Sequence, residues 1–120
     1  MFLYDPKEAE TKPEVKLEPW RQHLLDAAQY IREHGWFQGG ICDANQERVC
    51  LIGSLYASVG LLDAATKRTP HLALRIDEEW CRVLLYLGLN PRNCDIADWN
   101  DRPGRTKEEV IAALEGATRQ

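Results

Sequence analysis

The sequence has no long apolar run and no basic segment leading into one, and both absences exclude classes of protein. The longest apolar runs, such as residues 83–87, are far shorter than the roughly 20 residues that span a bilayer, so no membrane helix and no membrane partner are predicted. A secretory signal needs a basic start before its apolar stretch, and therefore none is predicted. The expected location is the cytoplasm.

The sequence also lacks a large excess of charge of either sign. The net charge is −4, and acidic and basic side chains are interleaved from Asp77 to Arg105. A nucleic-acid-binding surface needs clustered lysine and arginine side chains. Nucleic acid is therefore not an expected partner.

Cysteines are few and widely spaced, with 7, 30 and 12 residues between Cys42, Cys50, Cys81 and Cys94. This spacing matches neither a C-x-x-C pair nor a dense disulfide scaffold, so free thiols are predicted. A zinc site would combine Cys42, Cys50 or Cys94 with a histidine, but the gap of 7 residues is wider than in a zinc knuckle. We predict no metal and no cofactor. The histidines that could serve as ligands in such a zinc site are His23, His34 and His71.

No hydrolase motif, zinc-protease motif or phosphate-binding glycine loop is present. Cys50 lies near the expected start of a helix, where the helix dipole could lower its pKa and His34 or His71 could act as its base. A cysteine between apolar neighbours is, however, typical of a core. The consecutive acids at 77–79 point around a helix and indicate a solvated face. No catalytic residue is predicted, and a non-catalytic protein is favoured.

Residues 1–19 differ in composition from the rest of the chain. They contain four glutamates, three lysines and three prolines, with one apolar cluster at residues 2–4. The prolines block a long helix and the segment is too polar for a core. We predict an extended N-terminal arm at 1–19 and a single helical domain at 20–120. Because the apolar cluster costs free energy in water, the arm can dock on its own chain or join two copies in a homodimer.

Helical periodicity begins at Trp20, with apolar residues three and four positions apart up to Ile31. A glycine followed by an apolar residue at Gly35, Gly60 and Gly88 predicts three helix ends. The second helix is expected over about 47–59 and, since it is apolar on most sides, at the centre of the fold.

The third helix is expected to begin at Thr69 as cap and Pro70 as first residue and to run to Gly88, unless Asp77 caps a separate helix. The last helix spans Thr106 to about Thr118. Residues 38–41 read as a flexible link, and only 38–43 resembles a strand. The class is therefore all-α, a compact bundle of four to five helices with an extended N-terminal arm.

The segment DWNDRPGRTKEEV, at 98–110, has a structural and a functional interpretation. Thr106 and Glu109 form a capping box for the last helix, while Trp99 is an apolar anchor among turn-forming residues. Alternatively, the N–H groups of residues 104–106 and two arginines could hold an anion, or the loop could bind a partner. Acidic neighbours would compete with an anion for the arginines. The candidate binding residues are Trp99, Asn100, Asp101, Arg102, Arg105 and Thr106.

Several of these motifs occur together and in order: Gly-Trp at 35–36, Cys50 and Gly53, Trp-Asn-Asp at 99–101, Gly-Arg-Thr at 104–106 and Glu-Val at 109–110. In this the chain resembles a domain-of-unknown-function family of small proteins from actinobacteria and their phages, over roughly residues 24–117. The resemblance implies a bacterial or phage source and a reducing cytoplasm, and it carries no catalytic role.

These observations together favour a protein-interaction module that binds another protein. A phage protein of this kind can redirect or inhibit a host factor, a hypothesis that rests on the resemblance. The alternative is a small-ligand or anion-binding protein or enzyme that uses the loop from Trp99 to Thr106, with or without Cys50.

Overall fold

The computed structural model describes residues 18–90 and 95–120, so the predicted arm and Cys94 lie outside the described residues, apart from the last two positions of the arm. The described part is helical and contains no strand, which confirms the all-α prediction. It has six α-helices and one 3-10 helix, more than the four to five expected, because two short helices were not foreseen. In chain order these are α2 (Pro19–His34), α3 (Leu51–Ser58), α4 (Leu62–Thr66), η2 (Leu72–Ile76), α5 (Asp77–Leu87), α6 (Asp95–Asp101) and α7 (Lys107–Ala117).

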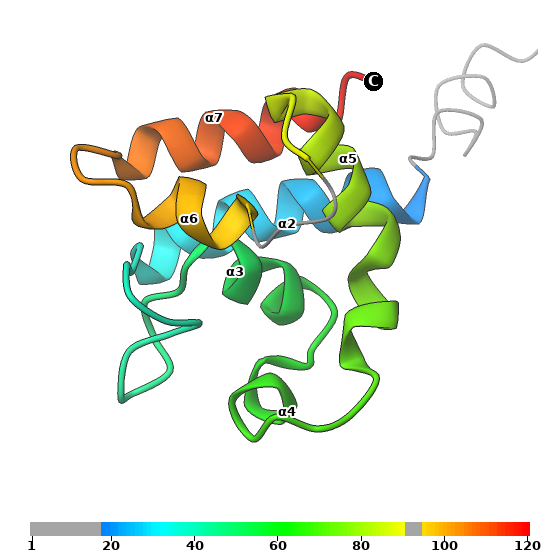
Figure 1. Ribbon diagram of the computed structural model, residues 1–120. Helices are drawn as coiled ribbons and strands as arrows, with labels where there is room; N and C mark the ends of the chain where they lie inside the picture. The colour runs from blue at the N-terminus through cyan, green and yellow to red at the C-terminus, as the bar shows by residue number, and fades with distance from the viewer. Residues whose placement is uncertain (1–17, 91–94) are drawn as a thin grey trace, which may run out of the picture.

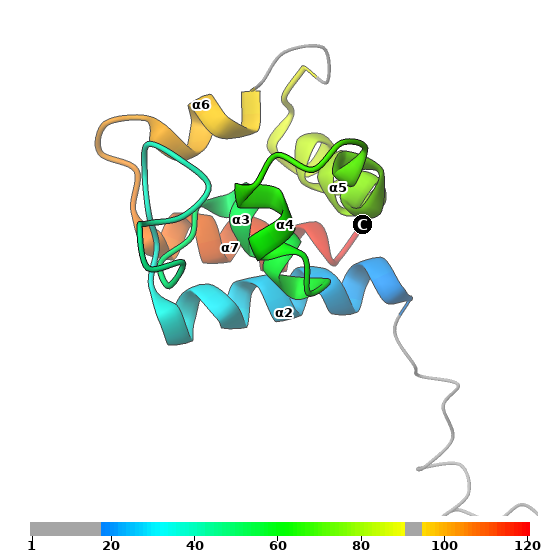
Figure 2. The same ribbon diagram turned by 90° about the horizontal axis from the view of Figure 1, so that it is seen from below.

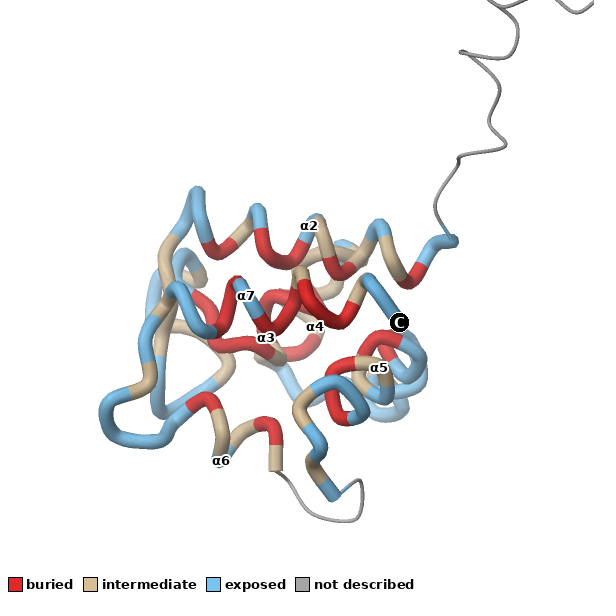
Figure 3. Tube along the Cα trace, turned by 90° about the horizontal axis from the view of Figure 1, so that it is seen from above, coloured by how far each residue is buried: buried red, intermediate tan, exposed pale blue. Residues whose placement is uncertain are grey.

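Helix α2 is the longest element, and α3, α5 and α7 pack around it. Figures 1 and 2 show α7 alongside α2, with α5 across one end of both helices. In Figure 3 the buried parts of α2, α3, α5 and α7 face one another and form the core. None of the described helices is long and apolar enough to cross a membrane.

The first helix follows its sequence pattern closely. Its buried residues are the predicted ones, and it ends at Gly35, whose φ of 105° suits glycine. Gly88 ends α5 in the left-handed conformation, as predicted. The residues that α2 buries are Trp20, Leu24, Ala27, Ala28 and Ile31.

The predicted start of the second helix at residue 47 is wrong, because α3 begins at Leu51. Val49 forms isolated bridges with Trp36 and Cys42. Its N–H donates to Gly35 O at 3.2 Å, and its carbonyl accepts from Phe37 N at 2.9 Å. Cys50 N–H likewise donates to Ile41 O at 3.0 Å. These long-range bonds replace the helical bonds that local periodicity favours.

Residues 70–88 form two elements rather than one. Thr69 and Pro70 do not start a helix, since η2 begins at Leu72 after His71, which has a φ of 66°. The 3-10 turn runs directly into α5, and Asp77 is the first residue of α5 rather than its cap.

The prediction that the acids at 77–79 form a solvated face is wrong for one of them. Glu79 is only 4% exposed, and its carboxylate lies 2.6 Å from Nδ1 of His23 on α2. A carboxylate leaves water at a large cost unless it is paired. The contact therefore belongs to the packing of α5 on α2.

Candidate functional site

Asn100, in the last turn of α6, is 1% exposed and lies at the centre of a hydrogen-bond network. Its side-chain oxygen accepts from the indole N–H of Trp36 at 2.7 Å and from the backbone N–H of Leu51 at 3.0 Å. Its amide nitrogen donates to the carbonyl of Phe37 at 3.1 Å and to the carboxylate of Asp101 at 2.9 Å. Both donors and both acceptor positions of this amide are therefore used within the protein.

The segment after Trp36 is fixed by the same part of the chain. The Gln38 side chain donates to the carbonyl oxygens of Asn100 at 3.0 Å and Arg102 at 3.2 Å. The N–H of Gly39 donates to the Asp101 carboxylate at 3.0 Å. Residues 38–41 are thus held at both α6 and α3, and the expectation of a flexible link is wrong.

Residues 98–101 were expected to form a turn but complete helix α6, so that expectation is also wrong. Asp98, Asn100 and Asp101 favour turns when their side chains bond to the local backbone. Asn100 bonds instead to distant residues, which leaves the local backbone free for the helix.

Arg105 and Thr106, the candidate anion-binding residues, bond to their own neighbourhood. The Arg105 guanidinium lies 3.8 Å from the centre of the Trp99 ring and donates to the Trp99 carbonyl at 2.9 Å. The predicted capping box is confirmed: Thr106 N–H donates to Glu109 Oε1 at 2.9 Å, and Glu109 N–H donates to Thr106 Oγ1 at 3.1 Å. Arg102 is exposed, and its side chain makes no hydrogen bond or ion pair within the described residues. Binding by this loop stays a prediction.

Cys50 does not have the environment of a nucleophile. It is 6% exposed, and its sulfur accepts from the N–H of Gly53 at 3.3 Å at the start of α3. Burial raises its pKa to about 11, although backbone hydrogen bonds act in the opposite direction. The core position that its apolar neighbours indicate is therefore confirmed, and the alternative of a thiol with a lowered pKa is not. A cavity of about 140 Å³ borders Cys50, Asn100 and Asp101, which is small for a ligand site.

The described cysteines 42, 50 and 81 are free thiols, as predicted. Within residues 18–90 and 95–120, no three histidine, cysteine or acidic side chains come together to hold a metal ion. The thiols and imidazoles thus offer no metal centre in this part of the chain.

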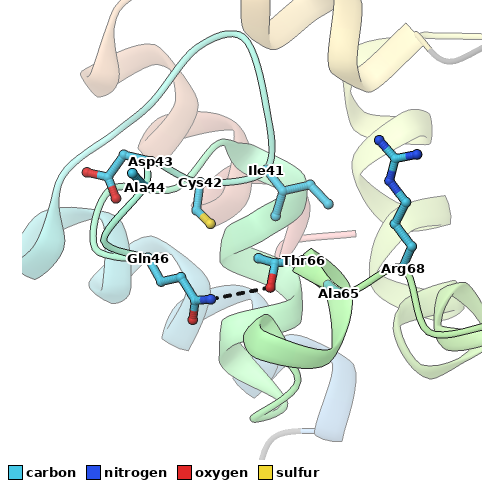
Figure 4. Close-up of a pocket in the computed structure, with 8 residues that line it drawn as sticks. All are labelled: Ile41, Cys42, Asp43, Ala44, Gln46, Ala65, Thr66 and Arg68. Carbon is cyan, nitrogen blue, oxygen red and sulfur yellow. Dashed lines mark hydrogen bonds between the residues drawn. The ribbon is translucent and has the colours of Figure 1, made fainter.

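A groove lies between the loop after α2 and the segment that follows α3. One cavity, of about 360 Å³, is lined in part by Cys42, Gln46 and Thr66 (Figure 4). A second, of about 260 Å³, is lined in part by Tyr56, His71 and Leu72. The two cavities share three lining residues, which are Ile41, Ala65 and Arg68.

The second exposed feature is an apolar face on η2 and α5. Leu74 is 72% and Leu85 is 69% exposed, and Cys81 between them is exposed as well. On α5, Val83 and Leu84 point to the core, so the exposed residues lie on the opposite side.

The profile of a family of unknown function, DUF6197, matches residues 16–120. The chain belongs to this family. No curated protein and no solved structure matches the chain. The DUF6197 match covers every described helix, and therefore also the Asn100 network, the groove and the apolar face.

Sequence reasoning missed the groove. Its lining residues come from four separate stretches of a chain segment with no motif, and the positive φ angles of Gln46, Arg68 and His71 occur at residue types that carry no strong turn signal. The exposed leucines were missed because nothing in the sequence distinguishes Leu74 and Leu85 from the buried leucines of the chain.

Proposed function

We propose that this chain is a non-catalytic protein-interaction module that binds a partner protein through the apolar face of η2 and α5. We call this surface the outer face and define it by Leu74, Cys81 and Leu85. The observation that carries the proposal is the exposure of two leucines, 72% and 69%, on consecutive helical elements.

The spacing of the outer face fits a contact with another chain. Cys81 and Leu85 are four positions apart on α5, which brings their side chains to one face of that helix, and Leu74 lies on the 3-10 turn that runs directly into α5. Single exposed apolar residues are common, but aliphatic residues grouped on one face are typical of interaction surfaces. Burying two leucine side chains would contribute about 1.5–3 kcal/mol each.

The charges beside the outer face favour one kind of partner segment. Glu78 pairs with Arg82 at 3.0 Å, whereas Asp77 makes no hydrogen bond or ion pair within the described residues. An amphipathic helix with apolar residues on one side and a lysine or arginine opposite Asp77 would complement both features. We therefore infer that the partner offers a basic amphipathic helix.

The setting of this function is also part of the proposal. The resemblance to proteins of actinobacteria and their phages supports a bacterial or phage source, action in the cytoplasm and, for a phage protein, a host factor as target. Such a partner would be present in an actinobacterial lysate.

The test uses paired variants of the full chain. Leu74→Glu/Leu85→Glu places two charges on the outer face, while Ala112→Glu/Asn45→Glu adds the same charge at exposed positions elsewhere. Proteins captured from the lysate by the wild-type chain are quantified for both variants, and a candidate is then purified and titrated. We expect at least tenfold weaker binding by the leucine variant alone, an effect of about 1.4 kcal/mol or more.

Two results would contradict the proposal. One is equal capture by the leucine variant and the wild type, and the other is an equal loss in both variants. All four positions are exposed and none is needed for the core, so both variants should fold. Circular dichroism of each variant checks that the helices are intact.

A further inference from the structure

The groove defined above by Ile41, Ala65 and Arg68 has the dimensions of a ligand site. Its two cavities, of about 360 and 260 Å³, adjoin at these shared residues. Sites for small molecules are concave, largely apolar and carry a few polar groups that orient the ligand. Here Ile41, Ala65 and Leu72 form the apolar walls.

Backbone strain is concentrated in this groove. The described chain has three non-glycine residues with positive φ, and all of them line it: Gln46 at 57°, Arg68 at 55° and His71 at 66°. This conformation is uncommon for residues with a side chain and costs free energy. Strained residues cluster at binding sites, where the surrounding fold holds them in place.

The polar side chains of the groove differ in whether they have a partner. Asp43, the acid among the lining residues, accepts from Arg48 at 3.0 Å. Asp63, which lines neither cavity, pairs with Lys67 at 2.9 Å. Gln46 donates to Asp63 at 3.2 Å and to Thr66 at 3.3 Å.

Arg68 is the arginine among the lining residues, and it is exposed. Its guanidinium makes no hydrogen bond or ion pair within the described residues, although it lines both cavities. Three other lining side chains likewise make no hydrogen bond within the described residues, namely those of Tyr56, Thr69 and His71. Figure 4 shows Arg68 at one side of the cavity, opposite Cys42, with Thr66 and Ala65 between them. The groove therefore presents one unpaired positive charge beside an apolar wall.

We propose that this groove binds a small carboxylic acid with an apolar body. The carboxylate pairs with the Arg68 guanidinium, whose planar donors match its two oxygens. The apolar body lies against Ile41, Ala65 and Leu72. A neutral ligand would leave the arginine unpaired, and a multiply charged ligand would place an anionic group against the Asp43 carboxylate.

The probe is 4-phenylbutyrate, with its uncharged amide as the matched compound. Each is titrated into the ¹⁵N-labelled full chain, and amide signals are followed by NMR. We expect saturable shifts at Gln46, Thr66 and Ala73 with the acid and at least tenfold weaker binding of the amide. Arg68→Gln should weaken binding of the acid by at least tenfold, because it removes the charge and keeps an unbranched side chain.

Arg75→Gln is the control variant, since Arg75 is exposed, lies on η2 and lines neither cavity. It should bind the acid as the wild type does. The proposal is overturned if the acid and its amide shift the signals equally, if no saturable shift occurs at millimolar acid, or if Arg75→Gln weakens binding as much as Arg68→Gln. A leucine-ended peptide that binds with a free but not an amidated C-terminus, while 4-phenylbutyrate does not bind, would also overturn it in favour of a peptide.

Discussion

The indole N–H of Trp36 donates to the side-chain oxygen of Asn100 over 2.7 Å, although the two residues are 64 positions apart in the sequence. The same oxygen accepts the N–H of Leu51 at 3.0 Å, at the first residue of α3. One buried amide thereby joins the segment after α2, the start of α3 and the end of α6. Through Asn100, the Trp-Asn-Asp motif therefore has a structural role in the fold.

Replacing Asn100 should destabilise the protein strongly. In Asn100→Ala the Trp36 and Leu51 N–H groups lose their common acceptor, and each unsatisfied buried group costs about 1–3 kcal/mol. We expect the free energy of unfolding to fall by about 3 kcal/mol in urea titrations. Asn45→Ala is the control, because Asn45 is exposed, and it should change stability by less than about 0.5 kcal/mol. Equal stability of the two variants would refute the structural role of Asn100.

Gly53 is required by a close approach of two backbones. A Cβ at this position would lie 2.2 Å from the carbonyl oxygen of Ile41. Replacing a glycine inside a helix by alanine usually raises the stability of the helix by about 1 kcal/mol. Here we expect the opposite sign, a loss of about 2–4 kcal/mol measured by urea unfolding, because the 38–41 segment must move away from α3. Gly40→Ala, whose Cβ would lie 3.5 Å from the Phe37 ring, should be nearly neutral.

These contacts explain which parts of the fold the sequence predicts. The apolar stripe of α2 and the capping box of α7 depend on residues three or four positions apart, and both are confirmed. The start of α3 and the whole of α6 depend on partners far away in the chain: Val49 bonds to Gly35 and Phe37, and Asn100 bonds to Trp36. Local sequence patterns do not predict hydrogen bonds to residues so far away in the chain.

The candidate sites divide in the same way. The loop from Trp99 to Thr106 stands out in the sequence because it is rich in special residue types, but the polar groups of Asn100 and Thr106 are used internally. The groove and the outer face consist of residues that belong to no sequence motif, and only the fold brings them together. Arg68 is one of several exposed arginines, and its position at two adjoining cavities sets it apart.

Glu109 should make stability depend on pH in the acidic range. Its pKa lies below the ordinary value of 4.5, chiefly because its carboxylate accepts the N–H of Thr106 and also because Arg105 is near. A lowered folded-state pKa contributes stability that is present above the unfolded-state pKa and is lost as pH falls through the folded-state pKa. The melting temperature should therefore fall less steeply below about pH 4.5 in Glu109→Gln than in the wild type. Glu108→Gln, at an exposed neighbouring position, should keep the wild-type slope.

The thiols should react in an order set by burial. The pKa of Cys50 is about 11, so on the order of one molecule in several thousand carries its thiolate at about pH 7.5. The pKa of Cys81 is also raised, by partial burial and then by Asp77 and Glu78, but Cys81 lies on the exposed outer face. Among the three described cysteines, we expect iodoacetamide to modify Cys81 first, half-buried Cys42 more slowly and Cys50 only after urea unfolding, as measured by peptide mass spectrometry. If Cys50 were modified in the folded protein as fast as Cys81, its thiol would be accessible and activated, and the preference for binding over catalysis would fail.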